Sequence, residues 1–207
     1  MKKSDFPPAF WVSGTNTDIG KTLVSAILLK WLGYSYYKPV QSGSLEGTDT
    51  NTIKELTQLP DSQFLPESVL LKEPLSPHTA AAMEGVTIDL DSINLPKTRP
   101  LLIEGAGGLL VPLNEDKLLI DLMVKFQLPV LLVASSGLGT INHTLLSIES
   151  LRTRGLELLG VILNGPLNQS NKKAVEHYGQ TRVLLELEKL SDVTPESLEK
   201  YITHLEK

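Results

Sequence analysis

The run from Gly14 to Thr22, which is bounded by glycines and ends in Gly-Lys-Thr, restricts the fold more than any other segment. It follows the apolar stretch 9–12 and precedes the amphipathic run 23–32, an order typical of a strand, a tight loop and a helix. Backbone N–H groups of such a loop and the positive end of its helix attract anionic oxygens. Five residues separate Gly14 from Gly20, one more than usual, so the loop is a long variant. An ordinary turn has no need of Gly-Lys-Thr, and the segment therefore predicts a polyphosphate site.

The end of this loop carries the two side chains with a chemical role in phosphate binding. Lys21 can reach the β- and γ-phosphates, and the Thr22 hydroxyl can ligate Mg²⁺. The pattern predicts that the chain uses a nucleoside triphosphate. We expect the nucleotide to contact Thr15, Asn16, Thr17, Asp18, Ile19, Gly20, Lys21 and Thr22.

The composition is that of a globular protein, with 41% hydrophobic and 21% charged residues in 207. This length suits one α/β domain, which we expect over residues 1–207. No apolar run approaches the roughly 20 residues of a membrane span, and the first residues lack the apolar core of a signal peptide. We therefore expect a cytoplasmic protein with no membrane partner.

Charge and cysteine content exclude several function classes. A net charge of −5 with four arginines gives no basic stripe, so no nucleic-acid partner is expected. The chain has no cysteine, which excludes thiolate zinc sites, iron–sulfur clusters and cysteine nucleophiles, including those of glutamine-hydrolysing amidotransferases.

Short apolar runs alternate with helix-length segments, a pattern typical of a parallel sheet with helices on both faces. Strands are expected at 10–12, 36–37, 101–103, 130–133, 158–163 and 183–185. Helices are expected at 21–32, 50–58, 77–84, 118–126, 140–154, 170–179 and 195–205, and the segment 55–77 is rich in loop residues. This predicts a single-domain α/β fold of the P-loop NTPase kind.

Polar residues follow several of the expected strands. In a parallel sheet, ligands bind outside the carboxyl ends of the strands, so chemistry is expected there. The residues at these ends are Lys38, Glu104, Ser135, Ser136 and Asn164.

Two carboxylates are candidate metal ligands. Glu104 comes directly after a buried strand and before Gly-Ala-Gly-Gly, and a carboxylate beside a phosphate loop is placed to hold Mg²⁺ directly or through water. The alternative is a carboxylate that only caps a turn, and the nearby loop favours the metal role. Asp49 precedes the helical run 50–58 and is either its N-cap or a second metal carboxylate; by itself the residue favours the cap.

Lys38 lies just before Pro39 at the end of the second strand. A flexible ammonium there suits a developing oxyanion or a carboxylate-like group, whereas a solvated surface lysine is the alternative, and position alone does not decide. The start of helix 140–154, preceded by Gly-Leu-Gly, predicts a second anion site sized for a carboxylate. No reaction step is assigned to the histidines His78, His143, His177 and His204.

Six segments taken together resemble the dethiobiotin synthetase family, in the family's order and over most of the chain from about 10 to 180. They are 14–22, 37–43, 76–78, 104–108, 138–143 and Asn164. The resemblance is specific because it combines the long phosphate loop with Tyr-Lys-Pro-Val at 37–40 and Glu-Gly-Ala-Gly-Gly at 104–108.

This resemblance implies an ATP- and Mg²⁺-dependent ligase of biotin biosynthesis that closes the ureido ring of dethiobiotin from 7,8-diaminononanoate and CO₂. In the family, one amine of the substrate becomes a carbamate, and the γ-phosphoryl group of ATP is transferred to it. The neighbouring amine then attacks the mixed anhydride. A homodimer is implied as well, because the family holds the substrate's carboxylate with the second subunit.

The resemblance also implies a role for each matching residue. Lys21 corresponds to the phosphate-binding lysine and Lys38 to the lysine that steadies the carbamate. Thr17 and Ser42 match residues lining the phosphoryl-transfer and diamine site, and Asn164 matches the asparagine that reads adenine. The implied magnesium ligands are Thr22, Asp49 and Glu104. The implied carboxylate site of the second subunit consists of Gly139, Thr140, Ile141, Asn142 and the accompanying Tyr178.

The sequence departs from the family's pattern at two places. Asp18 stands where some members carry glutamate, which shifts a contact near the diamine. The segment 184–190 lacks the Gly-x-x-Pro pattern of the adenine pocket, so selectivity for ATP over other triphosphates is left open.

Three other P-loop classes are alternatives. A small-molecule kinase shares the loop and the carboxylate but usually carries an arginine-rich lid, and no such cluster is visible. A partitioning-type ATPase that works through protein partners has an extra lysine early in the loop, where Thr15 and Asn16 stand. A GTPase needs Asn-Lys-x-Asp, yet Asn171-Lys172-Lys173 is followed by Ala174.

Overall fold

The computed structural model describes residues 2–190 and 192–205. Within these residues, six parallel strands form one sheet in the order β2-β5-β1-β6-β7-β8. Their bounds are β1 Ala9–Gly14, β2 Ser35–Tyr37, β5 Leu101–Gly108, β6 Val130–Ser135, β7 Leu158–Asn164 and β8 Val183–Leu187. Two short strands, β3 Val40–Gln41 and β4 Val69–Leu70, form a second parallel pair. The predicted α/β fold with a parallel sheet is confirmed.

Each predicted helix is present, with ends within one residue of the prediction. The α-helices are α1 Lys21–Leu32, α2 Asp49–Thr57, α3 Pro77–Met83, α4 Leu119–Phe126, α5 Thr140–Thr153, α6 Gln169–Gly179 and α7 Pro195–Leu205; two 3-10 turns are η1 Lys3–Asp5 and η2 Asp61–Gln63. Helix α2 ends at Thr57 because Gln58 adopts a left-handed conformation with φ 54°. The loop-rich segment 55–77 thus contains the end of α2, η2 and β4.

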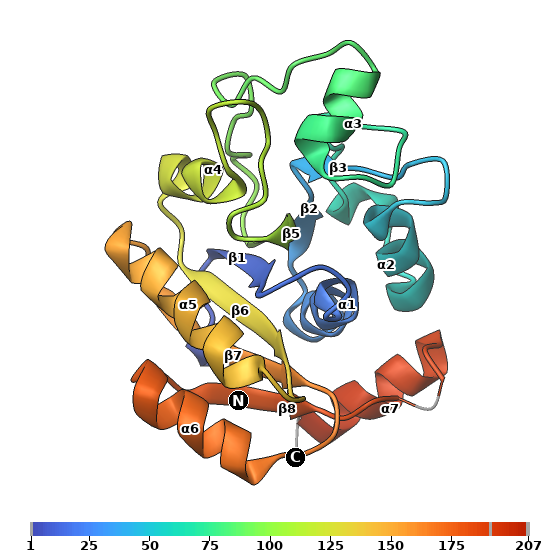
Figure 1. Ribbon diagram of the computed structural model, residues 1–207. Helices are drawn as coiled ribbons and strands as arrows, with labels where there is room; N and C mark the ends of the chain where they lie inside the picture. Colours follow the sequence, from blue (N-terminus) through green and yellow to red (C-terminus); the bar gives the residue numbers. More distant parts are fainter. Residues whose placement is uncertain (1, 191, 206–207) are drawn as a thin grey trace.

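Helices cover both faces of the main sheet (Figure 1). One hydrophobic cluster joins α1, α2 and α7 to one face, and two further clusters join α3, α4, α5 and α6 to the other. Successive strand residues point to opposite faces, so neighbours in β1 divide between these cores. Trp11 stacks on Phe126 of α4 with ring centroids 5.6 Å apart, while Val12 packs on the α1 side. This double coverage explains why the strands read as continuous apolar runs.

The strand order places the site. Strand β5 lies between β2 and β1, with Tyr37 paired to Ile103 and Val12 paired to Glu104. Lys38 follows Tyr37 directly, so Lys38 and Glu104 come together at the carboxyl edge of the sheet, beside the loop that follows β1.

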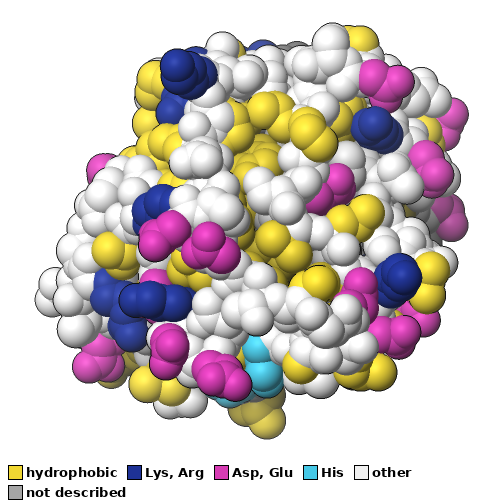
Figure 2. Space-filling model, turned by 90° about the horizontal axis from the view of Figure 1, so that it is seen from above, with side chains coloured by type: hydrophobic (Ala, Val, Ile, Leu, Met, Phe, Trp, Pro, Cys, Tyr) yellow, Lys and Arg dark blue, Asp and Glu magenta, His cyan; other side chains and the backbone are white. Residues whose placement is uncertain are grey.

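The surface is mixed in character. Figure 2, a view from above, shows basic side chains in separate places among acidic and hydrophobic ones, without a continuous basic stripe on this face. Among the helices described, none is long and apolar enough to cross a membrane.

Candidate active site

The loop after β1 needs both of its bounding glycines. A Cβ on Gly14 would lie 2.6 Å from Ile19 Cδ1 and 2.8 Å from the carbonyl oxygen of Asn16. Gly20 has φ 90°, and a Cβ there would lie 2.2 Å from Nδ2 of Asn164. Such approaches exclude any side chain, so the two glycines keep the loop folded back on the start of α1.

Lys21 is the first residue of α1 and is buried beneath this loop. Its ammonium donates to the carbonyl oxygen of Asn16 at 3.1 Å, and 7% of the residue is exposed. Burial lowers the pKa of Lys21, an effect that Glu104 partly offsets and Lys38 reinforces. A cation that is short of negative partners in the free protein is suited to receive the phosphates of a nucleotide.

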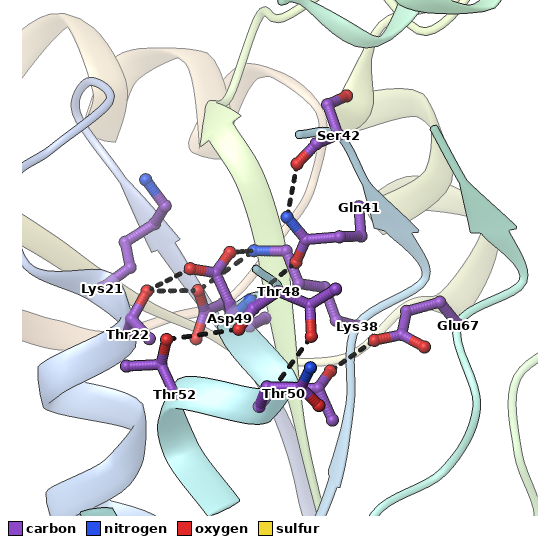
Figure 3. Close-up of polar contacts among 12 residues, drawn as sticks. Lys21, Thr22, Lys38, Gln41, Ser42, Thr48, Asp49, Thr50, Thr52 and Glu67 are labelled. Atoms are coloured by element: carbon purple, nitrogen blue, oxygen red, sulfur yellow. Dashed lines mark hydrogen bonds and ion pairs between the residues drawn. The ribbon is translucent and has the colours of Figure 1, made fainter. Parts of the chain in front are cut away.

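Three side chains, Thr22 of α1, Lys38 after β2 and Asp49 of α2, meet at one place, and the Lys21 side chain next to them points away (Figure 3). Glu104 of β5 contacts Thr22 and Lys38 there. The Thr22 hydroxyl is 2.8 Å from Oδ1 of Asp49 and 3.2 Å from Oε1 of Glu104. The Lys38 ammonium forms ion pairs with both carboxylates, 3.2 Å from Oε1 of Glu104 and in close contact with Oδ2 of Asp49. Among the three implied magnesium ligands, Thr22 thus contacts both Asp49 and Glu104, and Lys38 pairs with both carboxylates.

Charge pairing, not solvent, stabilises this cluster. Burial disfavours the charged ammonium, but the carboxylates of Glu104 and Asp49 outweigh it and raise the pKa of Lys38. Burial likewise disfavours the Asp49 carboxylate, but Lys38 and the Thr22 hydroxyl outweigh it and lower its pKa. Lys38 is 3% exposed, so the alternative of a solvated surface lysine is wrong.

The alternative role of Asp49 as a helix cap is also wrong. Thr48 is the N-cap of α2, and its side chain accepts a hydrogen bond from the backbone N–H of Asn51. Asp49 is the first residue inside the helix, and its carboxylate turns toward Thr22 and Lys38. Threonine and aspartate are both favoured at an N-cap, so residue type alone did not distinguish Thr48 from Asp49.

The donor set fits a hard divalent cation. Hydroxyl and carboxylate oxygens from Thr22, Asp49 and Glu104 are the ligands that Mg²⁺ prefers. Oε2 of Glu104 is buried without a protein hydrogen-bond partner, so it has a free lone pair for such an ion. The described residues contain no group of three His, Cys, Asp or Glu side chains that could hold a metal ion. The set of Thr22, Asp49 and Glu104 is not such a group, because one of its three members is a threonine.

The prediction that Glu104 comes directly after its strand is wrong, because β5 runs on to Gly108 beneath the phosphate loop, so Glu104 lies within the strand. A Cβ on Gly107 would lie 3.4 Å from Oγ1 of Thr17, and one on Gly108 would lie 3.5 Å from the carbonyl oxygen of Thr15. These close approaches bring Thr17 next to the strand that carries Glu104. Ser42, the other residue matched to the diamine site, has a buried Oγ without a hydrogen-bond partner.

Asn164 also belongs to this edge of the sheet. It ends β7, and its Nδ2 donates to the carbonyl oxygen of Ile19 at 2.8 Å. The side chain thereby supports the phosphate loop next to Gly20.

The residues matched to the second subunit lie apart from the cluster. Gly139 adopts φ 89° at the start of α5, and the Thr140 hydroxyl donates to the carbonyl oxygen of Ser135. Tyr178 of α6 is 68% exposed and packs edge-on against His177. Among the residues described, neither segment shares a hydrogen bond with Lys38, Asp49 or Glu104.

A glycine-bounded loop before a helix, with two carboxylates and a lysine gathered beside it at the carboxyl edge of a parallel sheet, defines a P-loop nucleotide-binding protein. A family profile described as "AAA domain" matches residues 9–197, and the chain belongs to that family. The fold also resembles a ParA family ATPase from Chlorobium tepidum, with TM-score 0.54 and 9% identity over 97% of this chain and 99% of that one. MinD from Aquifex aeolicus gives TM-score 0.53 and 12% identity over 97% of each chain. At these identities the likeness shows the fold alone.

Comparison with curated proteins of similar sequence identifies the family within the P-loop nucleotide-binding proteins. The ATP-dependent dethiobiotin synthetase of Paramagnetospirillum magneticum is 51% identical over 185 residues, 89% of each chain. That of Lawsonia intracellularis is 47% identical over 189 residues, 91% of this chain and 92% of the relative. The chain belongs to the family of ATP-dependent dethiobiotin synthetases, as its sequence motifs predict.

Proposed function

We propose that this chain is a ligase of biotin biosynthesis that closes the ureido ring of dethiobiotin from 7,8-diaminononanoate and CO₂ at the expense of ATP. Family membership carries the reaction, and the observation that carries the site is the pair of buried ammonium groups, Lys21 and Lys38, around one strand edge. Two cations at one edge suit a reaction in which a triphosphate and a carboxylated amine must be held together.

The bond changes are as follows. One amine of the diamine adds to CO₂ and loses a proton, which gives a carbamate. An oxygen of the carbamate attacks the γ-phosphorus, the bond to ADP breaks, and a carbamic–phosphoric anhydride forms. The second amine then attacks the carbonyl carbon and loses a proton, phosphate leaves, and the ring closes. Phosphorylation converts a poor oxygen leaving group into a good one, and the protein supplies positioning and charge stabilisation.

Lys21 and Lys38 divide the charge stabilisation. We assign Lys21 and the backbone N–H groups of 15–22 to the ATP phosphates, because the loop folds around that ammonium. Thr22, Asp49 and Glu104 would hold Mg²⁺, which when bound offsets the charge of the phosphates. With its two carboxylates engaged in that way, Lys38 is left with an ammonium free to hold the carbamate.

Thr17 and Ser42 are proposed to orient the diamine. The unpartnered, buried Oγ of Ser42 supports this role, because a buried hydroxyl without a partner gains a hydrogen bond when a substrate amine arrives. Asn164 is proposed to read adenine with its Oδ1, since Nδ2 already donates to Ile19.

We also propose that the protein acts as a homodimer, with the substrate's carboxylate held by Gly139, Thr140, Ile141, Asn142 and Tyr178 of the second subunit. At the start of α5 the N–H of Thr140 donates to the carbonyl oxygen of Gly137, and the N–H groups of Ile141 and Asn142 are the ones proposed to bind the carboxylate. The helices α5 and α6 and the loops before them also carry exposed apolar side chains, namely Leu138, Leu146, Leu167 and Tyr178. Residues 1–207 would act as one ligase domain in the cytoplasm, where ATP is available.

The central experiment supplies ATP, Mg²⁺, the diamine and labelled bicarbonate, and follows both ADP and label. We expect ADP release to require diamine and CO₂, and the label to appear in a cyclic urea. Equal ADP release without the diamine would instead support a partner-regulated ATPase. A stable phosphorylated product without label would support a small-molecule kinase.

A mixing experiment tests the shared site. Lys38→Ala removes the carbamate lysine, and Asn142→Asp places a negative charge where the substrate's carboxylate is proposed to bind. Each variant alone is expected to be inactive, whereas each mixed dimer regains one of its two sites. After random subunit exchange about half of the dimers are mixed, so an equal mixture should recover about a quarter of wild-type activity. No recovery after subunit exchange, or a fully active monomer in sedimentation, would contradict the shared site.

A further inference from the structure

Gln41 is a buried amide that joins two parts of the active site (Figure 3). It ends β3, is 6% exposed, and was not singled out from the sequence. Its Oε1 accepts a hydrogen bond from the backbone N–H of Asp49 at 3.0 Å, and its Nε2 donates to the carbonyl oxygen of Ser42 at 2.6 Å. One side chain thus contacts the helix that carries a metal carboxylate and the loop that carries Ser42.

The contact with Asp49 satisfies one of the backbone N–H groups at the start of α2. The first four N–H groups of a helix have no partner within the helix. Thr48 accepts from Asn51, and Gln41 accepts from Asp49, so two of these donors are satisfied by side chains. Gln41 holds the backbone N–H of Asp49. It therefore helps to fix the backbone position from which the Asp49 carboxylate reaches Thr22 and Lys38.

The second contact of Gln41 holds the backbone at Ser42, on the proposed diamine side of the site. Ser42 precedes Gly43, which has φ 77° and lies so close to Pro74 that a Cβ would approach within 3.2 Å. Gln41 holds the carbonyl oxygen of Ser42 and so helps to fix the backbone from which the buried Oγ of Ser42 projects. The hydroxyl proposed for the diamine and the carboxylate proposed for the metal therefore share one support.

We propose that Gln41 is a positioning residue that couples the metal site at Asp49 to the diamine site at Ser42, an inference that rests on the proposed function. Because coupling between two sites is reciprocal, the diamine strengthens Mg²⁺ binding by the same factor by which Mg²⁺ strengthens diamine binding. Each uncharged hydrogen bond of this kind corresponds to roughly a threefold to tenfold change in an equilibrium.

Two variants separate the two contacts. Gln41→Met keeps the length of the side chain and removes both hydrogen bonds. Gln41→Glu keeps an acceptor for the Asp49 N–H and removes the donor to Ser42. Gln63→Met is the matched control, because Gln63 is a half-buried glutamine whose amide donates to the carbonyl oxygen of Tyr34, which precedes β2, whereas Lys38 and the site follow it.

The first readout is amide hydrogen exchange at Asp49 in protein without metal or nucleotide. Exchange is expected to accelerate about tenfold in Gln41→Met and to stay near wild type in Gln41→Glu and Gln63→Met. The second readout is calorimetric binding of Mg²⁺ with ADP, expected to weaken about fivefold to tenfold in Gln41→Met. Unchanged exchange and unchanged binding in that variant would overturn the proposal.

The third readout is the steady-state effect of the diamine. We expect its KM to rise about threefold to tenfold in both Gln41 variants, with a smaller change in kcat, and the dependence of KM on Mg²⁺ to disappear in Gln41→Met. A loss of kcat alone, or a KM that keeps its dependence on Mg²⁺, would contradict the coupling. If wild type failed to convert the diamine, the proposed function would fall while the exchange and Mg²⁺ measurements still tested Gln41. A Gln41→Met protein with a lowered melting temperature but wild-type exchange at Asp49 would also contradict the positioning role of Gln41.

Discussion

Lys38, directly after β2, forms an ion pair with Glu104 of the neighbouring strand β5, with 3.2 Å between Nζ and Oε1 and side chains that are 4% and 0% exposed. Asp49 contacts the same ammonium, so two carboxylates share one lysine. The cluster has an excess of negative charge in a setting with little water to screen it. It is therefore arranged to accept a further cation.

Replacing Lys38 by Met is expected to destabilise the protein without metal by about 3–5 kcal/mol, because Glu104 is left buried without a counter-charge. Millimolar Mg²⁺ should restore part of that loss by binding the folded state. Urea unfolding in chelator and in Mg²⁺ measures both effects. The double variant Lys38→Met with Glu104→Gln should be more stable than Lys38→Met; a less stable double variant would contradict the prediction.

Lys21→Ala is expected to lower kcat by at least about 10²–10³-fold, because it removes a charged donor aimed at the phosphates. Lys30→Ala on the same helix is the control. Lys30 pairs with the exposed Glu199, so its loss should leave kcat unchanged and cost at most about 1 kcal/mol in stability. A comparable loss of activity in both variants would show that the fold of α1, not the Lys21 ammonium, is responsible.

Asn164→Ala is expected to raise the KM for ATP about tenfold and to weaken discrimination between ATP and other triphosphates, because it removes the support of Ile19 and the proposed contact with the base. Asn168→Ala provides the comparison. Asn168 caps α6, so that change should cost about 1 kcal/mol of stability without altering nucleotide preference. Competition between ATP, GTP and CTP measures the preference, and an unaltered preference in Asn164→Ala would remove its assigned role.

The charge cluster predicts a specific dependence of stability on pH in protein without metal. The folded pKa of Asp49 is lowered, so its contribution is present above the unfolded pKa of about 3.9 and is lost as pH falls through the folded value. The folded pKa of Lys38 is raised, so its contribution is present below about pH 10.4 and is lost as pH rises through the folded value.

Urea unfolding across pH tests both limbs. The stability difference between wild type and Asp49→Asn should shrink below about pH 4, and that between wild type and Lys38→Met should shrink above about pH 10. A difference that stays constant across either range would contradict the assigned ion pairs.

The sheet and helices were predictable because buried parallel strands are continuous apolar runs and helices follow the 3.6-residue period. The loop from Gly14 to Thr22 was predictable from its spacing. The environment of Lys38 was not, because it depends on β5 lying between β1 and β2, and strand order leaves no mark in the local sequence.

The start of α2 shows a second limit. Thr48 and Asp49 are both good N-cap residues, and local preference alone does not say which of them caps. The carboxylate of Asp49 turns into the site because Lys38 and Thr22 attract it there. Gln41 gave no signal at all, since its partner N–H lies eight residues further along the chain.

The place of β5 in the sheet has a consequence for synthesis on the ribosome. Strands β1 and β2 emerge first but never pair with each other, because the later strand β5 separates them. A nascent chain that has not yet exposed Leu101–Gly108 holds two unpaired strand edges and a lone Lys38. Translation past this strand first allows Lys38 to meet Glu104, and we expect stalling upstream of it to favour aggregation.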